Sequence, residues 1–250
     1  MLQIIPQLRR WRRVLLLFSG GLDSSLLLAA GREALGEGLT AFTVMGPQTA
    51  PGEVEAAWRL AKKFKVPHYL MELDPLLLPD FRENTRQRCY VCKQAMLARA
   101  QKVAAALQAE AIWDGTNLDD LGDFRPGLKA AREAGVISPL LTAGLGKKGI
   151  RELSRKLGLP EDKPSQSCLA TRFPYNTTLT REALARVGRA EAWLRARGFS
   201  HVRLRVRDRE ARLELAPEEW PIFLCQGLRG PFLGLLNSLG FEVLELALPG

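Results

Sequence analysis

The chain has 250 residues, of which 46% are hydrophobic and 25% are charged, and its formal net charge is +9. These proportions are typical of a globular protein with a sizeable core, and they exclude a disordered or fibrous chain. No apolar run reaches the ~20 residues that a membrane helix needs, and the apolar run 14–18 is too short for a signal-peptide core, so we expect a cytoplasmic protein.

From residue 14 to about residue 141, short apolar runs alternate with longer stretches of helical periodicity. They predict strands at 14–18, 40–44, 68–72 and 111–113, and helices at 22–34, 53–64, 90–107 and 149–157. This alternation is typical of right-handed βαβ crossovers, so it predicts an α/β unit with a Rossmann-like parallel sheet flanked by helices. We place this unit at residues 1–168.

The pattern changes after Pro164. Helices are predicted at 181–197 and 228–239, and a last strand at 241–248. Apolar and charged residues alternate strictly in 202–207 and again in 211–215, on either side of a turn, which predicts a β-hairpin. We therefore expect a smaller α+β domain at residues 169–250.

The strongest local signal lies between the first strand and the first helix, where the chain reads Ser19-Gly20-Gly21-Leu22-Asp23-Ser24-Ser25. The glycines let the backbone approach a ligand closely, and the free N–H groups at the helix start attract an anion. The serine hydroxyls add donors, and Asp23 can hold a Mg²⁺ ion that neutralises phosphate. No Gly-Lys-Ser/Thr follows, so this is not a Walker loop. We predict a phosphate-binding loop here, and we assign Thr43 and Gly115 to the same phosphate site.

An acidic loop follows the fourth predicted strand and contains Asp114, Asp119 and Asp120. Because ligands bind beyond the carboxyl ends of parallel strands, these carboxylates could face the nucleotide and its Mg²⁺. The alternative is a cluster of capping and turn residues. The sequence leaves the two roles open for each carboxylate.

Three of the four cysteines are candidate functional thiols. Cys89 and Cys92 form a Cys-x-x-Cys motif at a helix start, and Cys168 lies 76 residues further on. Without a second pair, this motif is a weak zinc signal, whereas three thiolates suit a 4Fe–4S cluster with one open iron. The alternative for Cys89 and Cys92 is that they are small buried hydrophobes, and we expect Cys225 to belong to the core.

Basic residues flank these cysteines. Arg88 and Lys93 lie beside the pair, and Lys163 and Arg172 lie near Cys168. Positive charge at these positions favours the thiolate, which is both the nucleophile and the metal ligand.

The predicted hairpin places apolar side chains on one face and arginines on the other. The arginines that we expect to bind an anionic substrate are Arg172, Arg203, Arg205 and Arg212. The alternative is a solvated sheet face with cross-strand ion pairs. Glu191 and Glu214 are candidates either for a divalent metal site or for these ion pairs.

The order of these segments resembles the LarE family of the PP-loop ATP pyrophosphatases. The matching segments are 18–25, 88–93, 114–123, 125–130, 138–140, 150–153, 168–175 and 202–205. The resemblance covers nearly the whole chain after residue 14, and 125–130 and 168–175 are its most specific parts. Thr171 stands where we expect serine and Asn176 where we expect glycine, and these departures concern the fine contacts with substrate.

The resemblance implies an ATP-dependent sulfurtransferase of nickel-pincer cofactor biosynthesis. The implied substrate is pyridinium-3,5-biscarboxylic acid mononucleotide, whose carboxylate is adenylated with release of pyrophosphate. A sulfur nucleophile then displaces AMP, and a thiocarboxylate results. Cys168 and Asp23 are the implied catalytic residues, with ATP and Mg²⁺ as cofactors.

Two sulfur routes are known in that family. In one, Cys168 would be sacrificed and left as dehydroalanine. In the other, Cys89, Cys92 and Cys168 would hold a 4Fe–4S cluster whose open iron carries a transferable sulfide. The presence of all three cysteines favours the cluster route, but the sequence leaves both open.

Other functions remain as alternatives. A tRNA thiolation enzyme of the TtuA type also joins a PP-loop to three cysteines, an amide-forming ligase such as NAD synthetase shares the loop, and a nucleotide-binding regulator could retain it without catalysis. The basic excess is scattered, with +6 in residues 1–165 and +3 in 166–250, so we expect no nucleic-acid partner. We expect a small-molecule nucleotide substrate, a homo-oligomer and no membrane.

Overall fold

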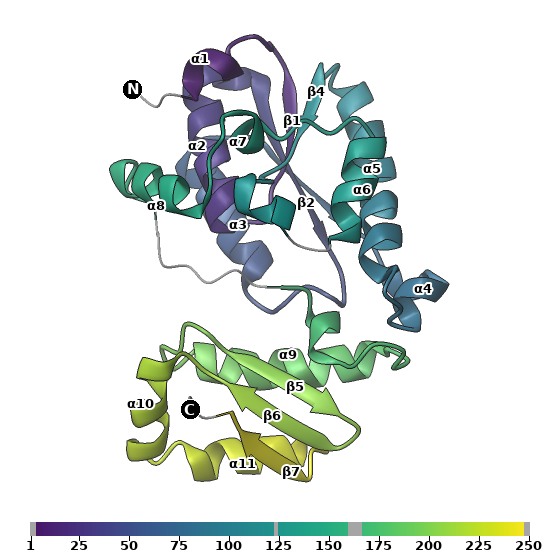
Figure 1. The fold of residues 1–250 in the computed structure, drawn as a ribbon, viewed down its shortest axis with the longest axis vertical. Helices are drawn as coiled ribbons and strands as arrows, with labels where there is room; N and C mark the ends of the chain where they lie inside the picture. The colour runs from purple at the N-terminus through teal and green to yellow at the C-terminus, as the bar shows by residue number, and fades with distance from the viewer. Residues whose placement is uncertain (1–3, 123–124, 160–166, 248–250) are drawn as a thin grey trace.

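The computed structural model describes residues 4–122, 125–159 and 167–247. Figure 1 shows a sheet covered by helices in the first part of the chain and a smaller sheet with its own helices in the last part. Asp123, Lys163 and Leu248, which the sequence analysis included in motifs or elements, lie outside the described residues.

The first sheet has four parallel strands in the order β3-β2-β1-β4. They are β1 (Val14–Leu17), β2 (Leu39–Met45), β3 (His68–Glu72) and β4 (Ala111–Trp113). In the central strand, Val14 lies opposite Leu39 on one side and Ala111 on the other. The parallel α/β sheet predicted from the sequence is confirmed.

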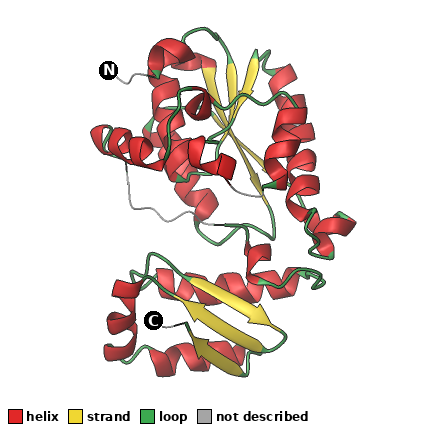
Figure 2. Cartoon of the chain, in the orientation of Figure 1, coloured by secondary structure: helices red, strands yellow, loops and turns green. Residues whose placement is uncertain are grey.

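Helices cover both faces of this sheet (Figure 2). They are α1 (Ile5–Leu8), α2 (Leu22–Leu35), α3 (Glu53–Lys63), α5 (Arg88–Ala106), α6 (Pro126–Glu133), α7 (Pro139–Thr142) and α8 (Lys147–Lys156). Successive side chains of a strand point to opposite faces. Accordingly, Leu16 packs with residues of α1, α2, α3, α7 and α8, whereas Leu15 packs with residues of α5 and α6.

The second sheet has the order β5-β6-β7. The strands β5 (Arg203–Arg207) and β6 (Glu210–Glu214) form the predicted antiparallel hairpin, and β7 (Val243–Leu246) pairs parallel with β6. Asp208 in the two-residue turn has a φ of 54°, a conformation that Asp tolerates in tight hairpins. The helices of this part are α9 (Arg181–Arg195), α10 (Trp220–Cys225) and α11 (Arg229–Ser238).

The core of the second part also takes side chains from the first. Phe81 of α4 (Pro79–Arg82) is a buried member of it, and Val91 and Cys92 pack against it. The buried Asn84 donates hydrogen bonds to the carbonyl oxygens of Phe173 (3.2 Å) and Pro174 (2.6 Å). The segment between β3 and α5 is therefore tied to the chain that follows Cys168, and a domain boundary at 168/169 stays a prediction.

Five short helices were missed from the sequence, namely α1, α4, α6, α7 and α10. Each carries a proline in its first turn. Proline is favoured there because its missing N–H would have no helical partner and its φ already suits the helix. This signal could have predicted these helices, although their shortness hides the periodicity.

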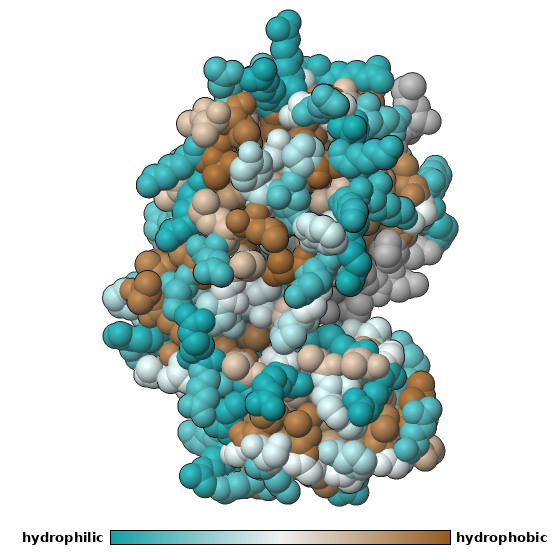
Figure 3. Space-filling view, turned by 180° about the vertical axis from the view of Figure 1, so that it is seen from behind, coloured by the Kyte–Doolittle hydropathy of each residue, from teal (hydrophilic) through white to brown (hydrophobic). Residues whose placement is uncertain are grey.

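The surface is mainly polar. Figure 3, a view from behind, shows hydrophilic residues over most of that face, with hydrophobic residues in separate patches. Within the described ranges, no helix combines the length and the apolar character that crossing a bilayer requires.

Candidate functional site

A pocket of about 680 Å³ opens at the carboxyl ends of β1, β2 and β4. Six of the eight predicted ATP-binding residues line it, namely Ser19, Gly21, Asp23, Ser24, Thr43 and Gly115. Ser200 and Glu218, from the last part of the chain, line the same pocket. The sequence did not single out these two residues, because neither belongs to a motif.

The loop between β1 and α2 has the form that an anion site needs. Gly20 has a φ of 70°, and an added Cβ would lie 3.0 Å from Cβ of Ala57, so only glycine fits there without strain. No side chain caps the start of α2. Its first N–H groups and the positive end of its dipole therefore face the pocket.

Hydroxyl groups complete this loop. Ser19 Oγ accepts a hydrogen bond from the Gly21 N–H (3.3 Å) and lies 3.1 Å from Ser24 Oγ. Ser25 is buried, and its N–H donates to the carbonyl oxygen of Gly21 at 2.9 Å. Ser25 thus shapes the loop, while Ser19 and Ser24 line the pocket.

The acidic loop divides between the two roles that the sequence left open. Asp114 and Asp120 line the pocket, where Asp120 pairs with Arg125 (2.6 Å) and Asp114 lies 4.0 Å from the Lys93 ammonium. Asp119 instead caps a helix, because its Oδ2 accepts the first N–H of α8, that of Lys147 (2.5 Å). Asp114 and Asp120 also accept turn hydrogen bonds, from the N–H groups of Thr116 and Asn117 respectively, so these two carboxylates combine both roles while Asp119 serves as a cap.

Thr43 connects the pocket to a half-buried histidine, His68. Its hydroxyl donates to the carbonyl oxygen of Phe18, so the hydrogen bond with His68 Nε2 (2.7 Å) must be donated by the imidazole. The other ring nitrogen, Nδ1, is buried without a hydrogen-bond partner within the described residues. Protonating it would leave a buried N–H unpaired, and burial lowers the pKa of His68 below its ordinary 6.5.

The protein is expected to lose stability as the pH falls below about 6.5, because unfolded His68 takes up a proton at its ordinary pKa and the folded form only at lower pH. Urea unfolding of wild type and His68→Gln at about pH 7.5 and about pH 5 checks this. The loss of unfolding free energy should be larger in wild type. An equal loss in both proteins would contradict the role given to His68.

The structure brings Cys89, Cys92 and Cys168 into electrostatic contact. Burial, with smaller contributions from the Cys168 and Cys89 thiols, raises the pKa of Cys92 to about 12. Burial also raises the pKa of Cys168 to about 11, against a backbone hydrogen bond from Ala170 and the positive charge of Arg88. Cys92 and Cys168 are therefore held as neutral thiols in the ligand-free protein near pH 7, and metal binding would release their protons.

Two expectations about the cysteines need correction. Cys225 is exposed, not part of the core, because α10 buries Trp220 and Phe223 and turns its other face outward. Cys89 is also exposed, so the buried-hydrophobe alternative does not apply to it. Among residues 4–122, 125–159 and 167–247, no three His, Cys, Asp or Glu side chains are grouped so as to hold a metal ion.

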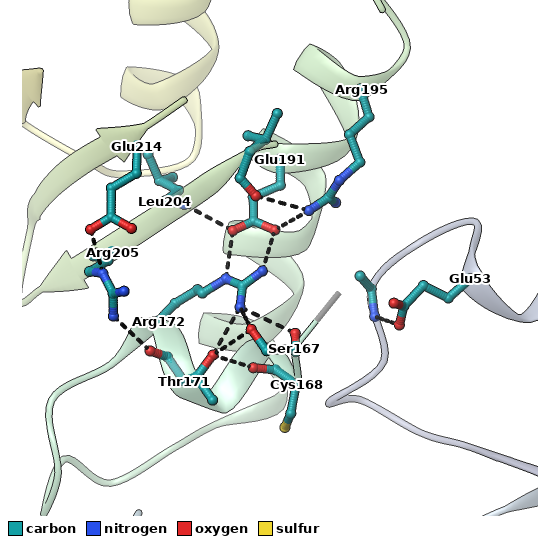
Figure 4. Close-up of polar contacts among 12 residues, drawn as sticks. Glu53, Ser167, Cys168, Thr171, Arg172, Glu191, Arg195, Leu204, Arg205 and Glu214 are labelled. Carbon is teal, nitrogen blue, oxygen red and sulfur yellow. Dashed lines mark hydrogen bonds and ion pairs between the residues drawn. The ribbon is translucent and has the colours of Figure 1, made fainter. Parts of the chain in front are cut away.

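Arg172 anchors the loop that carries Cys168 (Figure 4). Its guanidinium is buried and binds Glu191 through two contacts (Nε–Oε1 2.7 Å and Nη2–Oε2 3.1 Å). Its Nη1 donates to Oγ and the carbonyl oxygen of Ser167 and to Oγ1 of Thr171. The Cys168 sulfur points away from this guanidinium. Arg172 thus has a positioning role, and its direct contact with substrate stays a prediction.

Glu191 and Glu214 both act as ion-pair partners, one of the two roles that the sequence left open. Glu191 is fully buried, binds Arg195 (2.6 Å) besides Arg172, and accepts the Leu204 N–H at 2.8 Å. Glu214 binds Arg205 at 2.6 Å. Arginines thus occupy both carboxylates, which leaves a divalent metal there without structural support.

A second pocket, of about 340 Å³, is lined by the chain after Cys168 and by the hairpin, including Arg205 and Arg212. These two arginines lie directly opposite each other across β5 and β6. Like charges at such positions repel. The carboxylates of Glu214, paired with Arg205, and of Glu245, directly opposite Arg212 on β7, offset part of this repulsion. Burial and the nearby positive charge of Arg172 lower the pKa of Arg203. Arg203 therefore also lies close to other arginines.

Known proteins match this chain over most of its length. Residues 5–112 match the asparagine synthase family. An uncharacterised protein of Synechocystis sp. is 39% identical over 239 residues, which is 95% of this chain and 89% of that protein. The pyridinium-3,5-bisthiocarboxylic acid mononucleotide synthase of Lactiplantibacillus plantarum is 35% identical over 249 residues, or 99% and 90%. An NH₃-dependent NAD⁺ synthetase of Aeropyrum pernix is 31% identical over 162 residues, or 59% and 55%.

Proposed function

This chain belongs to the LarE family of PP-loop enzymes, and from that premise we propose that it converts carboxylates of pyridinium-3,5-biscarboxylic acid mononucleotide to thiocarboxylates. The observation that carries the proposal is the pocket at the start of α2, where an open helix N-terminus, serine hydroxyls and Asp23 meet. This set of groups suits a triphosphate and a divalent ion.

The first step is adenylation. A carboxylate oxygen of the substrate attacks the α-phosphorus of ATP, the bond to the β-phosphate breaks, and pyrophosphate leaves. The N–H groups at the start of α2 and the hydroxyls of Ser19 and Ser24 bind the phosphates. They also stabilise the charge that develops as the bond breaks.

Asp23 is the residue that fits Mg²⁺. Its Oδ1 is buried and has no hydrogen-bond partner within the described residues, and carboxylate oxygens are ligands that Mg²⁺ prefers. The ion, when bound, neutralises phosphate charge and so favours departure of pyrophosphate.

The second step transfers sulfur through Cys168. In the sacrificial route its thiolate displaces AMP from the acyl-adenylate and forms a thioester. The Cβ–Sγ bond then breaks as the α-proton is lost, which leaves dehydroalanine in the chain and a thiocarboxylate on the substrate. The buried ion pair of Arg172 and Glu191 holds the loop on which this occurs.

The cluster route uses the same cysteine with two others. Cys89, Cys92 and Cys168 would hold a 4Fe–4S cluster, which supplies a transferable sulfide when bound. Their mutual effect on pKa supports a shared site.

The arginine-lined pocket suits the rest of the substrate. Arg205 and Arg212 face each other there, and a phosphate or carboxylate between them would relieve their repulsion through bidentate hydrogen bonds. Arg203 extends the same positive surface. A tRNA substrate is not favoured, because only one of the four cysteines lies outside the functional trio, too few for the zinc modules of that class of thiolation enzyme.

Asp23→Ala is expected to lower AMP formation from ATP by roughly 10²-fold or more, because the metal ligand at the phosphates is lost. AMP and pyrophosphate would be quantified by chromatography after incubation with the biscarboxylate nucleotide. The control is Glu37→Ala, which changes an exposed residue just after the C-terminal end of α2 and should form AMP as wild type does. Normal AMP formation by Asp23→Ala would overturn the assignment of this loop.

A further inference from the structure

The carboxylate proposed to hold Mg²⁺ is already paired with a lysine. Nζ of Lys147 lies 2.5 Å from Oδ2 of Asp23, although the two residues are 124 positions apart in sequence. Both side chains are partly exposed, at 37% and 23%, and both line the 680 Å³ pocket. No motif of the sequence analysis included Lys147.

The position of this lysine is built into the fold. Lys147 is the first residue of α8, and its backbone N–H donates to Asp119 at 2.5 Å. The N–H of Asp119 in turn donates to Oδ1 of Asn117, which is fully buried. The loop after β4 therefore sets where α8 begins, and this start places the ammonium beside the PP-loop.

We propose that Lys147 is the counter-ion of Asp23 when no nucleotide is bound, and that it exchanges this carboxylate for the triphosphate when Mg-ATP enters the pocket. Asp23 is thereby released to the metal ion only when phosphates are present to receive the ammonium. The inference rests on the proposed nucleotide binding and deepens it, because it assigns Lys147 a positioning role toward both metal and phosphate.

Electrostatics makes the exchange possible. The ammonium and Mg²⁺ compete for one carboxylate, so each disfavours the other there. A triphosphate offers the ammonium a larger negative charge within the same pocket, and a lysine stem is long and flexible enough to follow it. In most nucleotide-free molecules Lys147 already occupies the Asp23 carboxylate. A metal ion must displace the lysine to bind there, so its apparent affinity is lower than it would be for an unpaired Asp23.

The test titrates Mn²⁺, an ion that takes oxygen ligands as Mg²⁺ does, into full-length protein without nucleotide and detects bound ion by electron paramagnetic resonance. Lys147→Met should bind Mn²⁺ about tenfold more tightly than wild type, since Asp23 is no longer paired. The double variant Asp23→Asn with Lys147→Met should lose this gain. Thermal unfolding confirms that each variant is folded.

Lys148→Met is the matched control. It removes the same charge from the adjacent residue, which is exposed and has no ion pair within the described residues. Its Mn²⁺ affinity should equal that of wild type. In the second titration, with Mg²⁺ and α,β-methylene-ATP, Lys147→Met should bind the analogue about tenfold more weakly while Lys148→Met should not.

An unchanged Mn²⁺ affinity in Lys147→Met would overturn the proposal, as would a gain that persists in the double variant or appears equally in Lys148→Met. An unchanged affinity for the analogue would overturn the exchange onto phosphate. The Mn²⁺ titration requires no catalysis. If wild type formed no AMP, the proposed function would be refuted, but the Mn²⁺ titration would still test the role of Lys147.

Discussion

Cys168→Ser is expected to abolish thiocarboxylate formation, with a loss of roughly 10³-fold or more, while the protein still forms AMP from ATP. A serine hydroxyl carries no sulfur to donate and does not ligate iron as a thiolate does. The residues proposed to bind the phosphates lie at the start of α2, on a different loop from Cys168. The measurement is mass spectrometry of the product together with quantification of AMP.

Cys225→Ser is the matched control, because this cysteine is exposed on α10 and belongs to neither pocket. It should retain thiocarboxylate formation. Full thiocarboxylate formation by Cys168→Ser would instead show that the sulfur does not pass through Cys168, and it would overturn both proposed routes.

The wild-type protein in the same experiment distinguishes the two sulfur routes. The cluster route predicts about four iron and four sulfide per chain after anaerobic reconstitution. The sacrificial route predicts no bound iron and a Cys168 peptide about 34 Da lighter after turnover, from loss of the elements of H₂S. Cys168 is central to both routes, so its substitution alone does not distinguish them.

Glu191→Ala is expected to lower the free energy of unfolding by about 3–5 kcal/mol, because it leaves the buried guanidinium of Arg172 without its partner. Glu191 is fully buried and binds two arginines and a backbone N–H, so its removal leaves all three of these groups without their carboxylate partner. Urea unfolding monitored by tryptophan fluorescence measures the change.

Glu214→Ala serves as the control for this second prediction. Its ion pair with Arg205 is partly exposed, with side-chain exposures of 26% and 47%, so its loss should cost at most about 1 kcal/mol. Equal costs for the two variants would contradict the anchoring role of Glu191. Because Arg172 holds the Cys168 loop, Glu191→Ala should also impair sulfur transfer more than AMP formation.

Several features could be predicted because each depends on a short stretch of sequence. The PP-loop joins β1 directly to α2, so its glycines, hydroxyls and carboxylate must lie together wherever the strand and helix form. The alternation in 202–207 and 211–215 likewise predicts which face of the hairpin is buried. The parallel sheet followed from the order of strands and helices, because few topologies accept that order.

Other features were hidden from the sequence, and each depends on how distant faces meet. Cys225 was expected in the core from its apolar neighbours, but the six-residue α10 has only one inward face, which Trp220 and Phe223 fill. Asp114, Asp119 and Asp120 look alike in sequence, yet only Asp119 meets the start of α8. Local composition does not distinguish such cases.

The sequence by itself determined the fold class, the phosphate-binding loop and the family, because these follow from local periodicity and from contiguous motifs. Only the tertiary structure decided which charges neutralise each other: Lys147 reaches Asp23 from 124 residues away, and Glu191 is buried between Arg172 and Arg195. The physical reason is that an ion pair depends on distance in space and on exclusion of water. Both arise only when the helices have packed against the two sheets.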